Sequence, residues 1–137
     1  MYVRILGIHP SNAPAWNNLG AWHERNGDLD RAYECFEGAV RSDSTFSHGY
    51  LNRGNVRFRL GDFAGAEADF RTAIRLKISL AEAYVGLARI HHHQGDIEGI
   101  VRELKIALRY NPALEEASTW LQSLWEAYER GDISIDF

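Results

Sequence analysis

The sequence contains very little cysteine: Cys35 is the single one among 137 residues. One cysteine excludes an intramolecular disulfide and a zinc site built from several cysteines. Cys35 lies in a helical pattern beside Phe36, without a paired histidine or a second cysteine. We therefore interpret it as a partly buried apolar residue and not as a reactive thiol.

Long apolar runs and an excess of basic residues are missing as well. No apolar run approaches the roughly 20 residues that a membrane-spanning helix needs, and the segment 1–8 is too short for a secretion signal with a cleavage site. We therefore expect a cytoplasmic protein without membrane insertion. The net charge of −4 and the pI near 5.8 argue against general binding of nucleic acid.

The usual catalytic patterns are also lacking. The chain contains neither a nucleophile elbow nor a phosphate-binding glycine loop, and its carboxylates are spread along faces that we expect to be exposed. The run His91-His92-His93 does not suggest a metal site, because consecutive helical residues point about 100° apart. We expect His91 to pack in the core, and we predict no enzyme, no cofactor and no metal.

The most prominent feature that is present is a turn that recurs every 34 residues. The dipeptide Gly-Asp occurs at Gly27, Gly61 and Gly95, each time between two helical patterns. Glycine supplies the left-handed residue that ends one helix, and the following aspartate can cap the next. A fixed period of this length predicts an array of helix–turn–helix units, the first of which begins with Asn12 as its cap.

The three units share a pattern of large and small residues. A small residue on the first helix would let the second helix approach, and a large residue on the second would fill the remaining space. Stacking of units would then bury the apolar surface that one helix pair leaves uncovered. The matching positions are Trp16/Tyr50/Tyr84, Gly20/Gly54/Ala88, Ala32/Ala66/Ile100, Phe36/Phe70/Leu104 and Ala39/Ala73/Ala107.

The C-terminal part predicts one further helix over residues 115–130. Its apolar stripe would lie on the third unit, and its polar face would point to water as a cap. Gly131-Asp132 repeats the turn, but 36 residues after Gly95, and we expect residues 131–137 to be loose or to fold back. The apolar stripe consists of Ala117, Trp120, Leu121, Leu124, Trp125 and Tyr128.

These residues resemble the tetratricopeptide repeat. The first unit carries the family's Trp-x-x-Leu-Gly pattern at residues 16–20, and Asn111-Pro112 resembles its closing proline. The resemblance implies an all-α fold, a right-handed α-solenoid of antiparallel helix pairs. The predicted segments are a remnant second helix over 1–12, repeats over 13–46, 47–80 and 81–114, a capping helix over 115–130 and a tail over 131–137.

What the resemblance implies about function is an adaptor or scaffold that binds a protein or peptide segment in a concave groove lined by the first helices. Three arginines in this groove oppose Glu24 and Glu82, while the other carboxylates, Asp69 among them, are expected on the outside. We therefore predict a partner segment of acidic character; the alternative is that the arginines form a solvated face. The predicted groove residues are Asn17, Asn18, Arg25, Leu51, Asn52, Asn55, Phe58, Arg59, Val85, Arg89, His92 and His93.

The middle unit departs from the family pattern. Arg53 and Arg57 stand where the family usually buries apolar groups. A buried unpaired guanidinium would cost several kcal/mol, so we expect the stems to pack and the heads to reach a carboxylate or solvent. Ligand contact by these two arginines is the alternative.

One subclass of the family can be tested against the sequence. The carboxylate-clamp repeats that bind chaperone C-termini place lysine and asparagine on the first helix, asparagine on the third, and a Lys/Arg pair on the fifth. The corresponding residues here are Asn17 and Ala21, then Asn52, then Glu82 and Gly86, of which Asn52 agrees. We therefore do not assign the chain to that subclass.

Two other functions remain as alternatives. The apolar residues between Tyr2 and Ile8 resemble half a repeat that could dock on a second copy and form a homo-oligomer, and they favour a cut within a longer array. RNA binding would require a continuous basic and aromatic groove, which Glu24, Glu82 and the net acidity oppose.

Overall fold

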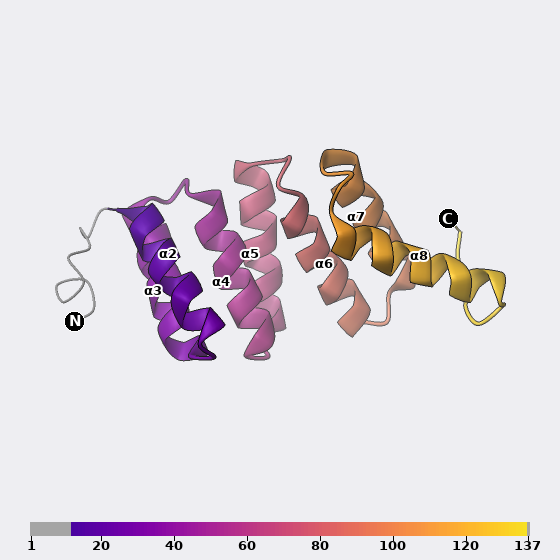
Figure 1. The fold of residues 1–137 in the computed structure, drawn as a ribbon, viewed down its shortest axis with the longest axis horizontal. Helices are drawn as coiled ribbons and strands as arrows, with labels where there is room; N and C mark the ends of the chain where they lie inside the picture. The colour runs from indigo at the N-terminus through magenta and orange to yellow at the C-terminus, as the bar shows by residue number, and fades with distance from the viewer. Residues whose placement is uncertain (1–11, 137) are drawn as a thin grey trace. The chain divides into compact units, whose positions relative to one another are not determined.

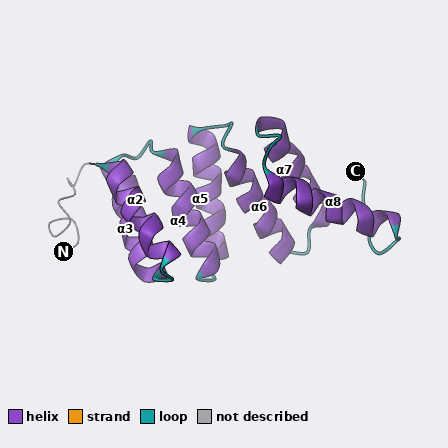
Figure 2. Cartoon of the chain, in the orientation of Figure 1, coloured by secondary structure: helices purple, strands orange, loops and turns teal. Residues whose placement is uncertain are grey.

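The structure is a computed structural model that describes residues 12–136. Among these residues the regular elements are all helices, and Figure 2 shows no strand in the part that is drawn in colour. The prediction of an all-α fold is confirmed. The helices are α2 (Ala13–Arg25), α3 (Leu29–Ser42), α4 (Ser47–Arg59), α5 (Phe63–Leu76), α6 (Ala81–His93), α7 (Ile97–Tyr110) and α8 (Glu115–Glu129).

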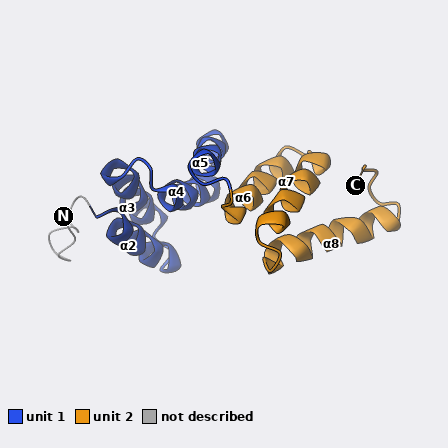
Figure 3. Ribbon diagram, turned by 90° about the horizontal axis from the view of Figure 1, so that it is seen from above, with its two compact units in different colours: residues 1–78 blue, residues 79–137 orange. Residues whose placement is uncertain are grey.

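The chain divides into two compact units, which Figure 3 shows in different colours. Unit 1 comprises residues 1–78 and contains α2 to α5; unit 2 comprises residues 79–137 and contains α6 to α8. In unit 1, α2 packs against α3 and α4 against α5, while α3 and α2 also contact α4. In unit 2, α7 contacts both α6 and α8 (Figure 1).

The recurring Gly-Asp turns end one helix and begin the next. Gly27, Gly61 and Gly95 have φ angles of +79°, +89° and +75°, which only glycine adopts without steric cost. The next residue, Asp28 in the first turn, donates its backbone N–H to the carbonyl of His23 at 2.9 Å. The carboxylates of the three aspartates then accept backbone bonds from the residues three positions later, at 2.9–3.2 Å. The predicted turns and caps are confirmed, including the cap by Asn12 on Ala15.

The predicted small and large positions pack against each other. A Cβ atom added to Gly54 would lie 2.8 Å from Cε1 of Phe70, and one added to Gly20 would lie 2.6 Å from Cε1 of Phe36. Glycine is therefore what allows the two helices of a pair to come this close. The core positions of all three pairs are less than 3% exposed: Ala32, Phe36, Ala39, Ala66, Phe70, Ala73, Ile100, Leu104 and Ala107.

The last helix is less covered than its apolar stripe suggests. Ala117 is its one buried residue, while Trp125 and Tyr128 are about two-fifths exposed. After α8, Gly131 has a φ of +80° and Asp132 donates to the carbonyl of Ala127 at 2.9 Å, so the turn geometry of the repeats is present once more. Ile135 is 8% exposed, which places this part of the tail back against the protein.

Two expectations from the sequence concern features outside this description. The predicted remnant helix over residues 1–12 lies outside the described residues except for Asn12. The right-handed superhelix stays a prediction. No helix within residues 12–136 has the length and apolar character to cross a bilayer.

Candidate functional site

In unit 1, the predicted groove residues lie on the neighbouring first helices α2 and α4. The side chain of Asn52 donates to the amide oxygen of Asn17 at 2.8 Å, and both residues are half-buried. Asn18 is exposed and Asn55 half-buried on the same two helices. The structure therefore brings the asparagines of α2 and α4 together in one polar row.

A charged pair extends this row toward the C-terminal ends of the two helices. Nη1 of Arg59 lies 3.4 Å from Oε2 of Glu24. The Arg59 side chain is 50% exposed and the Glu24 side chain 25%. Arg25 is exposed nearby in sequence, at the last residue of α2.

The apolar residues predicted for the groove are part of the core. Leu51 is 6% exposed in unit 1 and Val85 is 2% exposed in unit 2. Phe58 is half-buried and its ring packs against Phe63 at 5.2 Å between centroids. In this structure Leu51 and Val85 support the polar row from beneath and offer a ligand almost no surface.

In unit 2, the corresponding surface is a groove of about 600 Å³ between α6 and α8. Arg89 of α6 forms an ion pair with Glu116 of α8. His92 lies edge-on to the ring of Trp120, with 5.9 Å between centroids, and His93 is exposed. The groove is lined by Arg89, Glu115, Glu116, Thr119, Trp120 and Ser123.

The residues that α8 contributes to this groove were not predicted from the sequence, which assigned α8 to a cap with its polar face in water. A signal was present, because Glu116, Thr119, Trp120 and Ser123 stand 34 residues after Glu82, Val85, Gly86 and Arg89. The repeat period therefore continues through α8 on its groove-facing side. Only the turn after α8 is shifted by two residues.

The charges of the two surfaces differ in sign. In unit 1, Arg25 and Arg59 against Glu24 give +1. In unit 2, Arg89 against Glu82, Glu115 and Glu116 gives −2 with neutral histidines. The positive character expected for the groove is therefore a property of unit 1 alone.

The two unusual arginines of α4 pair with a buried carboxylate. Arg53 donates from Nε and Nη2 to both oxygens of Asp69, at 3.0 and 2.8 Å, and Arg57 donates from Nη1 to Oδ2 at 3.0 Å. Arg57 also donates to the hydroxyl of Tyr33 at 3.0 Å. The predicted carboxylate pairing of Arg53 and Arg57 is confirmed.

The expectation that Asp69 lies on the outside is wrong. This residue is 2% exposed, because α5 turns it toward the two guanidinium groups of α4. The hydrogen bonds to Asp69 also raise the pKa of Arg53, against the effect of burial. Arg53 and Arg57 therefore serve the fold of unit 1.

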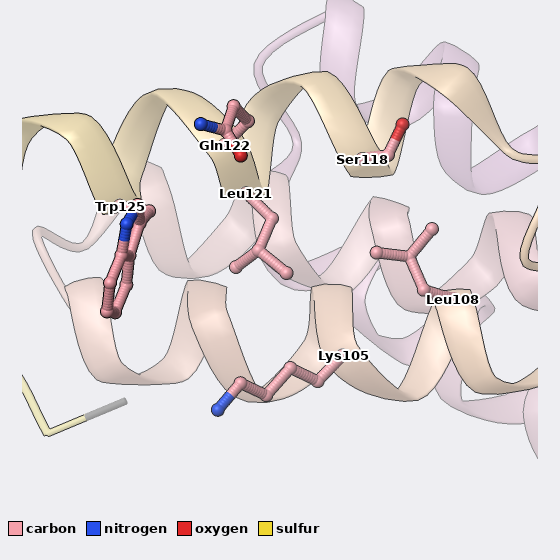
Figure 4. A pocket seen from close by; sticks show the side chains of 6 residues that line it. All are labelled: Lys105, Leu108, Ser118, Leu121, Gln122 and Trp125. Atoms are coloured by element: carbon pink, nitrogen blue, oxygen red, sulfur yellow. The ribbon is translucent and has the colours of Figure 1, made fainter.

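A second groove, of about 530 Å³, lies on the other side of α8, between α8 and α7. Figure 4 shows Leu121 pointing from α8 toward α7, with Leu108 opposite and Trp125 at one end. Lys105 of α7 supplies the charge at its rim. This groove belongs to the incompletely covered apolar stripe.

The remaining reactive residue types are placed in the core. His91 is 8% exposed, with its ring nitrogens 3.3 Å from Oδ2 of Asp96 and 3.4 Å from Oε1 of Glu103. Burial raises the pKa of the Cys35 thiol to about 11, and the carboxylates of Glu34 and Asp28 add to the shift. Cys35 is thus an inert core thiol, as predicted. No group of three potential metal ligands occurs among residues 12–136. The exposed surfaces are suited to noncovalent binding.

Comparison with known proteins gives matches to one family and one fold. Two family models, both described as tetratricopeptide repeat, match residues 13–46 and 51–99. A search of the curated proteins finds no match.

The solved structures that resemble this chain include three repeat domains or proteins. The first TPR of Spaghetti (RPAP3), bound to the HSP90 peptide SRMEEVD, has a TM-score of 0.78 at 24% identity, covering 88% of this chain and 96% of that chain. The first TPR domain of human RPAP3 has a TM-score of 0.79 at 24% identity, with coverages of 93% and 100%. MamA has a TM-score of 0.77 at 21% identity, with coverages of 93% and 75%.

Proposed function

Because the chain belongs to the tetratricopeptide repeat family, we propose that it is an interaction module that binds an extended segment of a partner protein on its first helices. The observation that supports this most directly is the polar row of unit 1. There Asn17 and Asn52 form an amide pair beside the ion pair of Arg59 with Glu24. The role is binding without catalysis.

The polar row suits the main chain of an extended peptide. An asparagine side chain presents both a carbonyl acceptor and amide donors, which match the C=O and N–H groups of a peptide backbone. The amide pair of Asn17 and Asn52 uses one donor and one acceptor, so each side chain keeps further hydrogen-bonding capacity. A segment lying across α2 and α4 would therefore find partners whatever its own side chains are.

The cations of the same surface favour an acidic segment. Arg25 and Arg59 give this surface a net charge of +1, and guanidinium groups bind carboxylates with charge-assisted hydrogen bonds. The RPAP3 domain with a similar fold has been solved with a peptide, SRMEEVD, that contains acidic residues. We do not extend the likeness to a carboxylate clamp, because Glu82 and Gly86 stand where that clamp has its basic pair.

The groove of unit 2 would take a different part of the segment. Trp120 is half-buried between hydroxyl-bearing and charged side chains, so its ring offers an apolar surface inside a polar rim. An apolar side chain of the partner fits this surface better than it fits Leu51 or Val85, which are covered.

The test compares two charge reversals of similar exposure. Arg59→Glu changes an arginine of the polar row, and Arg71→Glu changes an arginine on α5 whose side chain is 57% exposed. Binding is measured by fluorescence anisotropy with labelled extended peptides that contain glutamates, and with matched peptides in which these are glutamines. We expect Arg59→Glu to weaken binding of the acidic peptides about tenfold, because a repulsive contact replaces an attractive one, and Arg71→Glu to have little effect.

Circular dichroism would show that both variants retain the helicity of the unchanged protein. Equal affinities for the acidic and the amide peptides, or equal effects of the two substitutions, would contradict the proposal.

A further inference from the structure

Two of the arginines on the first helices are already paired with a carboxylate of the neighbouring first helix. In unit 1, Arg59 of α4 contacts Glu24 of α2. In unit 2, Arg89 of α6 contacts Glu116 of α8. In each unit the carboxylate belongs to the protein itself and occupies the position that a ligand carboxylate would take.

These pairs differ from the buried arrangement around Asp69. Asp69 is 2% exposed and accepts three hydrogen bonds from two arginines. Arg59 and Glu24, in contrast, share one contact of 3.4 Å, and half of the Arg59 side chain is exposed. Exposed single-contact pairs contribute little to stability, so water or another carboxylate can replace one partner at small cost.

We infer that Glu24 and Glu116 are internal competitors that set the selectivity of the two surfaces for carboxylate-bearing segments. This inference rests on the proposed function. A partner carboxylate reaches Arg59 or Arg89 by displacing the protein's own glutamate, which moves out into solvent. A partner without a carboxylate at that position leaves the internal pair in place and gains nothing from the arginine.

The exchange favours particular geometries in the partner. A guanidinium group can bind a carboxylate through two parallel hydrogen bonds, which is a stronger arrangement than one long contact. A segment that offers this bidentate geometry would displace Glu24, whereas a poorly placed carboxylate would not. The internal glutamate therefore raises the threshold for binding and discriminates against weakly matched partners.

The experiment removes each competitor without changing its size. In Glu24→Gln and Glu116→Gln we expect glutamate-containing peptides to bind about two- to fivefold more tightly than to the unchanged protein, the range set by a weak exposed pair. The matched glutamine peptides should bind with unchanged affinity. The control variants are Glu67→Gln, which alters an exposed pair with Arg71 on α5, and Glu98→Gln on α7.

A second variant separates exchange from a general change in charge. In an Arg59→Gln background, Glu24→Gln should no longer tighten binding, because the guanidinium for which the two carboxylates compete is gone. Equal tightening in the presence and absence of Arg59, or equal tightening by Glu67→Gln, would overturn the inference.

The remaining outcomes separate the inference from the proposed function. If the unchanged protein binds acidic peptides and neither glutamine variant binds them more tightly, the inference alone is overturned. If acidic peptides bind only after Glu24 or Glu116 is removed, the inference is supported. If no form of the protein prefers acidic peptides, both the proposed function and the inference fall.

Discussion

Asp69 accepts hydrogen bonds from two arginines of α4 although its own side chain is almost fully buried. Neither charge could be tolerated there alone, because an unpaired ion in a protein interior loses its hydration without compensation. The guanidinium groups also lie over aromatic rings, Arg53 at 5.6 Å from the centroid of Tyr50 and Arg57 at 5.4 Å from that of Tyr33. The stems pack while the heads are held, which is how two cations fit between helices.

Replacing Asp69 by asparagine should therefore destabilise the protein strongly. Asp69→Asn keeps the shape but leaves two partly buried guanidinium groups without a counter-charge, and we expect a loss of about 3–5 kcal/mol in the free energy of unfolding. Urea denaturation followed by circular dichroism measures this loss. The matched control is Glu67→Gln, whose partner Arg71 lies 3.8 Å away on the surface, and which should change stability by less than about 1 kcal/mol. A loss of similar size in both variants would contradict the assignment.

At the level of the helices, each pair is held close by a small residue that faces a large one. Units 1 and 2 solve this packing differently: Gly54 faces Phe70, whereas Ala88 occupies the same position opposite Leu104. A larger residue on the first helix is thus accompanied by a smaller one on the second. The sum of the two volumes is what the helix pair conserves.

Exchanging this arrangement in unit 1 tests the packing rule. Gly54→Ala places a Cβ atom 2.8 Å from the Phe70 ring, and the resulting strain should exceed the gain of about 1 kcal/mol in helix propensity, for a net loss of about 1–2 kcal/mol. Adding Phe70→Leu makes room for the methyl group. We expect the double variant to be more stable than the sum of the two single changes predicts, as measured by chemical denaturation. Additive losses would show that the ring and the glycine do not depend on each other.

At the scale of the whole molecule, the chain passes from one compact unit to the next through a short exposed junction. Lys77, Ile78 and Ser79 are all exposed, and Ile78 is 65% exposed. Exposed turns between compact units are the places where a protease can bind a chain in extended form without unfolding a helix.

Limited proteolysis should report this junction. We expect the first tryptic cut that divides α2–α8 into two groups to fall after Lys77, giving one fragment with α2 to α5 and one with α6 to α8. Mass spectrometry of the early fragments identifies the site, and Lys77→Gln removes it. An earlier cut inside one of the helices, with Lys77 intact, would contradict the prediction.

How much the sequence predicts depends on the distance over which an interaction acts. Gly61 and Asp62 could be interpreted directly, since a positive φ and a helix cap involve only neighbouring residues. Asp69 could not, because its burial depends on Arg53 and Arg57 of another helix. The repeat columns held a hint, as residues 35, 69 and 103 are Cys, Asp and Glu opposite His23, Arg57 and His91.

The sequence by itself determined the helices, their turns and the core positions, because these follow from local conformational preference and from a period of 34 residues. Only the tertiary structure decided which charges meet. Glu24 and Arg59 are 35 residues apart and Arg89 and Glu116 are 27 apart, so their pairing depends on how neighbouring helices bring side chains together. Helix positions could be inferred from one chain of letters, whereas the partners of each charge required the packed helices.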